Sequence, residues 1–549
     1  MKVSGNDLFV TAMKKEGVDT IFAYPGGMVV NLLDALHDCH GIDLVLPRHE
    51  QGLIHAADGY ARATGKVGVC LVTSGPGATN LVTGIATANY DSIPLVCFTG
   101  QVPEHLIGND AFQEVDIIGV TRNIAKFVIM VRDREMLAQR IKEAFYIART
   151  GRPGPVLIDL PKDVMGELGS AEYPETVNIR GYKPNTSVHI GQLKRAIKML
   201  GRAKKPLFLA GGGVIISRAN EVFTKLVEKT NIPVVTTVMG RGAIPTNHPL
   251  YIGNLGMHGA YACNMAVSDC DLLFSIGTRF NDRITGKLHS FAPNAQIVHI
   301  DIDTASISRN IHVDIPIVAD AKEAITKMNE YVQECSTDKW LKQIQEWKEE
   351  HPLTMKDRGM MGPLDIIGEI NRQFDKAILV TDVGQHQMLV SQYADITENR
   401  QLIMSGGLGT MGYGLGAALG AKSGREDKVV VNIAGDGCFR MNMNEIATAV
   451  RHNIPVIQVV INNHVLGMVR QWQNLFYGQR YSATVLNDAV DFVKLAEAMG
   501  AEGIRATTQE EFKSAFEKAM NLGRPVVIDC QIDSDDKAVS YTHLTLPTN

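Results

Sequence analysis

Short runs of apolar, mostly β-branched residues recur along the whole chain and alternate with stretches of helical periodicity. The clearest runs are 67–72, 94–98, 155–160, 206–211, 233–238, 271–277, 296–302, 377–383, 428–435, 455–462 and 525–532. Strands that are apolar throughout and separated by helices are typical of parallel sheets that helices cover on both faces. The sequence therefore predicts an α/β fold made of doubly wound parallel sheets.

Two segments interrupt this alternation and divide the chain. Residues 167–188 are polar and lack periodicity, and residues 334–362 mix charges with two tryptophans before a proline follows. We interpret both segments as linkers. The expected domains are 1–166, 189–333 and 363–533, which suits a chain of 549 residues.

The first and third domains resemble each other in sequence. Residues 84–97 and 445–458 are identical at six of fourteen positions, at an offset of 361 residues. The same offset aligns 74–77 with 435–438, and 151–160 resembles 523–530 near the domain ends. Three matches in the same order indicate tandem copies of one unit.

Composition and charge exclude several classes of protein. The net charge of -5 provides no bulk attraction for nucleic acid or for an anionic membrane. No apolar stretch of 18 residues predicts a membrane span, and residues 1–17 resemble a helix capped by Ser4 and Asp7 rather than a signal peptide. Eight cysteines without a CxxC pair suggest the reduced thiols of a cytoplasmic protein.

The strongest chemical signal lies in the third domain. One predicted strand ends in Gly435, Asp436 and Gly437, and 24 residues separate this motif from Asn462 and Asn463 at the end of another. Parallel strands open onto one edge, so Asp436 and Asn463 can offer oxygens to one Mg²⁺ ion shared with a diphosphate. The glycines let backbone amides approach that diphosphate at a helix N-terminus.

This motif resembles the signature of the thiamine-diphosphate-dependent enzymes. The resemblance implies tandem thiamine-diphosphate-binding domains and a third, backbone metal ligand at Val465. It also implies that Glu50, in PRHEQG (47–52), binds the cofactor's pyrimidine ring and supports proton transfer. Met411, which falls opposite Glu50 at the repeat offset, would lie under the bend of the cofactor.

Within that family the chain is most similar to the catalytic large subunits of acetolactate synthase, also called acetohydroxyacid synthase, over about residues 1–537. AYPGG (23–27), SGPGATN (74–80), GQVP (100–103), DAFQE (110–114), LGMHG (255–259), FNDRITG (280–286), GGLGTMGYGLGAA (406–418) and GMVRQWQNLFYGQRYS (467–482) carry the resemblance. It implies that Arg283 binds the carboxylate of the second 2-ketoacid and that Trp472 shapes the preference for it. Further residues implied at the channel or cofactor are Phe112, Gln113, Lys126, His258, Gly409 and Met468.

The middle domain has features of a flavin site. Gly211, Gly212 and Gly213 lie between a predicted strand and a helix, a weak signal of phosphate binding by itself. Arg279 could meet a diphosphate, and Asp301 or Asp320 the ribityl or adenosine end. The resemblance implies bound FAD, as in acetolactate synthases, although flavin-linked pyruvate oxidases use the same domain for electron transfer.

The expected reaction is the decarboxylation of pyruvate and transfer of the two-carbon hydroxyethyl unit to pyruvate or 2-ketobutyrate, the first common step toward valine, leucine and isoleucine. The alternatives are a pyruvate oxidase, a catabolic FAD-independent acetolactate synthase and an inactive truncated subunit. The resemblance implies a homodimer or dimer of dimers with shared active sites and a separate small regulatory subunit. Residues 538–549 depart from the family, so we expect a foreign tail there and assign His543 no function.

Overall fold

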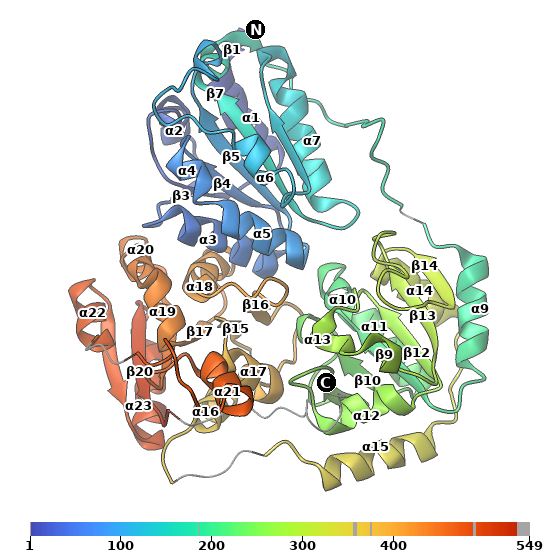
Figure 1. The fold of residues 1–549 in the computed structure, drawn as a ribbon. Helices are drawn as coiled ribbons and strands as arrows, with labels where there is room; N and C mark the ends of the chain where they lie inside the picture. The colour runs from blue at the N-terminus through green and yellow to red at the C-terminus, as the bar shows by residue number, and fades with distance from the viewer. Residues whose placement is uncertain (1, 186, 355–358, 374–375, 487–489, 535–549) are drawn as a thin grey trace.

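The computed structural model describes residues 2–534 except 186, 355–358, 374–375 and 487–489. Within these residues, three six-stranded sheets have only parallel ladders, and helices cover both faces of each sheet (Figure 1). The predicted α/β fold with three doubly wound sheets is therefore confirmed. The domain boundaries at 166, 189, 333 and 363 stay predictions.

The first domain has a sheet in the order β3-β2-β4-β5-β7-β6. Ser4 caps its first helix by accepting a hydrogen bond from the Asp7 amide at 3.1 Å, as predicted. The strands are β2 (Thr20–Ala23), β3 (Asp43–Val45), β4 (Gly68–Val72), β5 (Leu95–Gln101), β6 (Phe127–Met130) and β7 (Pro155–Pro161), with an antiparallel pair of β1 (Lys2–Ser4) and β8 (Leu168–Ser170) outside the sheet. The helices are α1 (Gly5–Lys15), α2 (Val30–His37), α3 (Glu50–Thr64), α4 (Pro76–Thr79), α5 (Val82–Asp91), α6 (Ile117–Thr121), α7 (Leu137–Arg149) and α8 (Lys162–Gly166).

The third domain repeats this topology, with the order β16-β15-β17-β18-β20-β19. Position by position, its strands follow the same sequence of pairings as the first sheet, which supports the interpretation as tandem copies. The strands are β15 (Ile378–Thr381), β16 (Leu402–Met404), β17 (Val430–Gly435), β18 (Val456–Asn462), β19 (Glu502–Ala506) and β20 (Val526–Gln531). The helices are α16 (Pro363–Gln373), α17 (Gln385–Tyr393), α18 (Tyr413–Gly424), α19 (Asp436–Asn442), α20 (Ile446–Arg451), α21 (Gly467–Phe476), α22 (Phe492–Ala498) and α23 (Gln509–Leu522).

The middle domain has a different strand order, β11-β10-β9-β12-β13-β14. This is the 3-2-1-4-5-6 order of dinucleotide-binding Rossmann domains, in which ligands bind where the strand order reverses, here between β9 and β12. The strands are β9 (Pro206–Ala210), β10 (Val234–Thr236), β11 (Tyr251–Asn254), β12 (Leu272–Ile276), β13 (Gln296–Asp301) and β14 (Ile315–Val318). The helices are α9 (Ile190–Leu200), α10 (Gly212–Ile216), α11 (Asn220–Thr230), α12 (Tyr261–Asp269), α13 (Asp282–Thr285) and α14 (Ala321–Tyr331).

The second expected linker contains a helix, α15 (Asp338–Glu350). Its Trp340 is 2% exposed and donates a hydrogen bond from Nε1 to the Pro206 carbonyl at 3.1 Å. Trp340 belongs to the buried apolar cluster of the middle domain, and the partly buried Trp347 packs against it. Packing on the middle domain therefore stabilises this helix.

The first and third domains pack through α3 and α18 (Figure 1). The contact is close because of glycines: a Cβ added at Gly59 would overlap the Ala417 carbonyl, and one added at Gly420 would overlap the Ala56 carbonyl. One cluster of buried apolar side chains extends through both domains. It contains Leu53 of the first domain together with residues of β17 and α18 in the third domain. Across the described residues, no helix combines the length and the apolar character needed to cross a membrane.

Candidate active site

Asp436 and Asn463 lie at the same edge of the third sheet. β17 and β18 are neighbouring parallel strands, with Gly435 paired to Ile461, and each residue directly follows its strand. Asp436 is 1% exposed, and its Oδ2 atom has no hydrogen-bond partner within the described part of the chain. Burial raises the pKa of this carboxyl to about 6. A buried carboxylate oxygen without a partner fits a cation ligand.

Asn463 and Val465 form a compact turn beside it. The Asn463 Oδ1 atom accepts a hydrogen bond from the Val465 amide at 3.2 Å, and both residues are buried. Among the described residues, no group of three or more His, Cys, Asp or Glu could hold a metal ion. An ion here would therefore take further oxygens from a backbone carbonyl and from a bound ligand, as Mg²⁺ does with a diphosphate.

Glycines allow close packing at this edge. A Cβ at Gly437 would lie 2.5 Å from Leu466, and one at Gly435 would lie 3.2 Å from the His386 ring. Gly409 has a φ of 72°, in the left-handed region that favours glycine. Met411 is half-buried against the cluster shared by the first and third domains. The predicted diphosphate-binding glycines thus border the Asp436 edge or a neighbouring loop.

Glu50 is the first residue of α3 and accepts a hydrogen bond from Asn80 Nδ2 at 2.9 Å. The backbone just before it is fixed by the third domain, because the buried Glu445 carboxylate accepts from the amides of Arg48 and His49. Glu50 is therefore held in a defined place at a domain junction, within contact range of α4 through Gly77.

A cavity of about 1020 Å³ lies where all three domains meet. Ten of the predicted site residues line it: Gly212, Gly213, His258, Arg279, Arg283, Asp301, Asp320, Gly409, Met468 and Trp472. The other predicted site residues are not among the described residues that line it: Glu50, Phe112, Gln113, Lys126, Gly211, Met411, Gly435, Asp436, Gly437, Asn463 and Val465. The cavity nevertheless borders the Asp436 edge, because Met468, which lines it, directly follows Gly467, where a Cβ would lie 3.2 Å from the Asn463 side chain.

The middle-domain part of the cavity lies at the switch point between β9 and β12. Gly213 packs so closely on Gly277 that a Cβ at either would lie within 2.7 Å of the other's backbone. Arg279 is largely buried there, and burial followed by the nearby Arg152 lowers its pKa. The Asp320 carboxylate caps α14 through the Glu323 amide at 3.1 Å. A cationic, glycine-lined switch point fits a dinucleotide phosphate.

Arg283 and Trp472 face the cavity from the middle and third domains. The Arg283 side chain is 58% exposed and 3.8 Å from the Asp282 carboxylate, so it can turn toward a ligand. Trp472 is 41% exposed and makes an edge contact with Phe476 on α21. The two predicted substrate residues thus border one cavity.

The three predicted channel residues of the first domain lie elsewhere in this chain. Phe112 is 85% exposed, and Gln113 packs against Gly75 with a φ of 60°. Lys126 is half-buried and donates from Nζ to the Thr150 carbonyl at 2.6 Å and to the Tyr182 hydroxyl at 2.9 Å. Burial, with Arg152 nearby, lowers the pKa of Lys126 to about 8. Their place at a substrate channel stays a prediction.

Sequence reasoning missed the residues that follow β15. Val383, Gly384 and Gln387 line the cavity, and the buried Asp382 carboxylate accepts from the Gly412 and Gly414 amides at 2.9 and 3.0 Å. The sequence did contain a signal for them: the polar segment TDVGQHQ (381–387) comes at the end of an apolar run. That run is the strand β15, which pairs with β17. The signal was missed because strand neighbours are not visible in the sequence.

Comparison with known proteins gives matches along almost the whole chain. Three family descriptions match: thiamine pyrophosphate enzyme, N-terminal TPP binding domain (residues 3–120), central domain (193–328) and C-terminal TPP binding domain (382–530). The acetolactate synthase large subunit of Haemophilus influenzae is 44% identical over 97% of this chain and 95% of its own length. A probable acetolactate synthase large subunit of Methanococcus aeolicus is 46% identical (97% and 92%), and the isozyme 3 large subunit of Escherichia coli is 44% identical (97% and 96%).

Proposed function

Because the chain belongs to the thiamine pyrophosphate enzymes and, within them, to the acetolactate synthase large subunits, we propose that it decarboxylates pyruvate and joins the remaining two-carbon unit to pyruvate or 2-ketobutyrate. This is the first common step toward valine, leucine and isoleucine. The observation that carries the proposal is the identity of 44–46% to acetolactate synthase large subunits over 97% of the chain.

The third domain would hold thiamine diphosphate and Mg²⁺. Asp436 and Asn463 would offer side-chain oxygens and Val465 its carbonyl. Gly435 and Gly437 have no side chain to keep a diphosphate away from their backbone amides. The partnerless Oδ2 atom of the buried Asp436 supports this assignment, because an ion would satisfy it. Bound thiamine diphosphate supplies the electron sink for decarboxylation of a 2-ketoacid.

Glu50 would hold and move a proton at the cofactor's pyrimidine ring. Its hydrogen bond from Asn80 fixes the carboxyl at the start of α3. No hydrogen bond or ion pair among the described residues joins Glu50 to Asp436. We propose that Glu50 serves the cofactor held by a second copy of the chain, in a homodimer or dimer of dimers. Mixing inactive Glu50→Gln and Asp436→Asn chains should restore some activity; no rescue after verified subunit exchange would refute a shared site.

Arg283 and Trp472 would select the second 2-ketoacid. The guanidinium can bind a carboxylate by a forked ion pair, and the Trp472 indole, which lines the same cavity, would limit the size of the side chain that fits. With pyruvate and 2-ketobutyrate in competition, Trp472→Leu should change the product ratio.

Arg283→Met should raise KM for the acceptor and release acetaldehyde. The control is Arg309→Met, which changes another arginine of the middle domain that does not line the cavity.

FAD is proposed for the middle domain on the strand order and the glycine contacts at the switch point. The same features favour the second candidate function, a flavin-linked pyruvate oxidase. Flavin that bleaches on pyruvate addition and reduces an external acceptor at the rate of turnover would establish the oxidase. Protein purified without any bound flavin but fully active would instead indicate a catabolic acetolactate synthase.

A small regulatory subunit is the proposed partner, since the similar proteins are named large subunits. We also propose that the chain works in the cytoplasm. Co-expression with a small subunit should raise activity and make it sensitive to valine; unchanged activity and no valine response would contradict this. The predicted foreign tail, residues 538–549, lies outside the described residues.

A further inference from the structure

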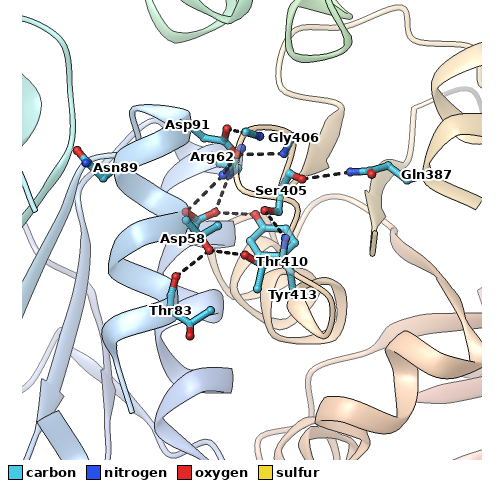
Figure 2. Close-up of polar contacts among 12 residues, drawn as sticks. Asp58, Arg62, Thr83, Asn89, Asp91, Gln387, Ser405, Gly406, Thr410 and Tyr413 are labelled. Carbon is cyan, nitrogen blue, oxygen red and sulfur yellow. Dashed lines mark hydrogen bonds and ion pairs between the residues drawn. The ribbon is translucent and has the colours of Figure 1, made fainter. Parts of the chain in front are cut away.

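Asp91, the last residue of α5 in the first domain, binds a loop of the third domain. Its carboxylate accepts hydrogen bonds from two consecutive backbone amides, Gly406 to Oδ2 at 3.2 Å and Gly407 to Oδ1 at 2.8 Å. Figure 2 shows Asp91 and Gly406 facing each other across the domain junction. A Cβ added at Gly407 would lie 2.5 Å from Asp91 Oδ1, so the loop backbone can approach this closely only as glycine.

A buried ion network holds the Asp91 carboxylate in place. Arg62 donates to Asp91 Oδ2 at 2.9 Å and to Asp58 Oδ1 at 2.6 Å, and the Tyr413 hydroxyl donates to the same Asp58 oxygen at 2.6 Å (Figure 2). Burial alone would lower the pKa of Arg62, but Asp58, Tyr413 and Asp91 raise it well above its usual value. The guanidinium is therefore permanently charged, and it holds the Asp91 carboxylate by an ion pair of 2.9 Å.

The loop that Asp91 binds, residues 405–409, lines the large cavity. The Ser405 hydroxyl accepts from the Thr410 amide at 3.1 Å, and the Ser405 carbonyl accepts from Gln387 Nε2 at 3.3 Å. Between these anchors, Gly406 and Gly407 have Asp91 as the acceptor of their amides. The carboxylate thus fixes the middle of the loop, two residues before Gly409.

We propose that Asp91, supported by Arg62, is a positioning residue that sets the loop 405–409 for binding thiamine diphosphate in the same chain. The inference rests on the proposed function, because it takes thiamine diphosphate as the ligand of the third domain. Asp91 and Arg62 are among the residues that line the cavity, but in this role Asp91 would not itself touch thiamine diphosphate. It would act through the two amides, as a pre-organising contact that lowers the cost of ordering the loop around its ligand.

The test is a double-mutant cycle read by calorimetric binding of thiamine diphosphate with Mg²⁺ to the full chain. Asp91→Asn keeps one acceptor oxygen but loses the other, together with the charge that pairs with Arg62, so it should weaken binding about tenfold. The clash in Gly407→Ala should weaken it by a similar factor. Since both changes remove one contact, the double variant should bind no more weakly than the worse single variant. The apparent affinity for cofactor should fall while KM for pyruvate stays within about twofold.

The matched control is Asp159→Asn. Asp159 is a buried carboxylate of the first sheet that accepts from Thr99 and Gln101 and does not line the cavity. It should lower thermal stability without weakening cofactor binding. Wild-type affinity in Asp91→Asn, or multiplicative losses in the double variant, would overturn the positioning role. Absence of binding by the wild-type chain would instead refute the proposed function, and the inference with it.

Discussion

Replacing Gly420 by alanine should separate the first and third domains. Gly420 lies inside α18, where an added Cβ would approach the Ala56 carbonyl of α3 closer than the 3.0 Å that real Cβ atoms keep from their neighbours. The two helices must move apart, which costs about 1–3 kcal/mol in overpacking. A shift of about 1 Å would also lengthen the 2.6 Å hydrogen bond from Tyr413 to Asp58, worth about 1.5–3 kcal/mol because the acceptor is charged.

The better helix propensity of alanine offsets about 1 kcal/mol of this loss. The free energy of unfolding should therefore fall by about 1.5–5 kcal/mol, which corresponds to a Tm lower by roughly 3–20 °C for a domain of this size. Differential scanning calorimetry of the cofactor-free chain measures this change in Tm. The account also predicts weaker thiamine diphosphate binding, because Arg62 belongs to the displaced helix α3 and holds Asp91 against the loop 405–409.

Gly368→Ala is the matched control. Gly368 lies inside α16, and a Cβ there meets nothing within 4 Å, so this variant should be as stable as the wild type or more so. If Gly420→Ala left Tm within about 1 °C of the wild type, the helix contact would not be the rigid junction described here.

Three further predictions concern single groups. Glu50→Gln should bind cofactor almost normally but lose turnover by about 10²–10⁴, since an amide cannot move the proton; steady-state rates and cofactor titration measure this. Asp436→Asn and Asn463→Ala should weaken binding of thiamine diphosphate and Mg²⁺ together, as read by calorimetry, because the proposed ion would be held by both the protein and the diphosphate. Burial lowers the pKa of His55 to about 3, so the unfolded chain takes up its proton first and Tm should fall as pH drops below about 6.5 toward 3.

Each of these three predictions has an outcome that would contradict it. Wild-type turnover in Glu50→Gln would show that Glu50 does not transfer the proton. Unchanged Mg²⁺ affinity in either ligand variant would disprove the assignment of that residue. For His55, which is fully buried with both ring nitrogens partnerless among the described residues, the His55→Leu variant should lose less Tm on acidification than the wild type. Equal slopes would mean that other groups control the acid response.

The central strands and the repeat were predictable from sequence because they depend on local pattern. Every apolar run named above contains a strand, since a strand buried on both faces must be apolar at every position. Edge strands such as β19, GluGlyIleArgAla at 502–506, are half-exposed and carry no such pattern. Asp436 and Asn463 were found because strand ends of parallel neighbours meet at one edge.

The contacts between domains could not be predicted. Asp91 and Gly407 are 316 residues apart in sequence, and neither residue belongs to a motif that announces the pairing. The same holds for Glu445, which accepts from the Arg48 amide across 397 residues. Such pairs form only when packing of α3 on α18 has fixed the relative place of two domains, so they require the three-dimensional structure.

The carbon balance of the wild-type chain with pyruvate, thiamine diphosphate, Mg²⁺ and FAD tests the central claim most directly. Carboligation consumes two pyruvate molecules for each carbon dioxide released and yields one acetolactate, whereas simple decarboxylation or oxidation consumes one pyruvate for each carbon dioxide. Carbon dioxide, residual pyruvate and acetolactate are quantified from the same reaction. The account predicts the two-to-one balance with acetolactate as the product; a one-to-one balance with acetaldehyde or with a reduced external acceptor would contradict it.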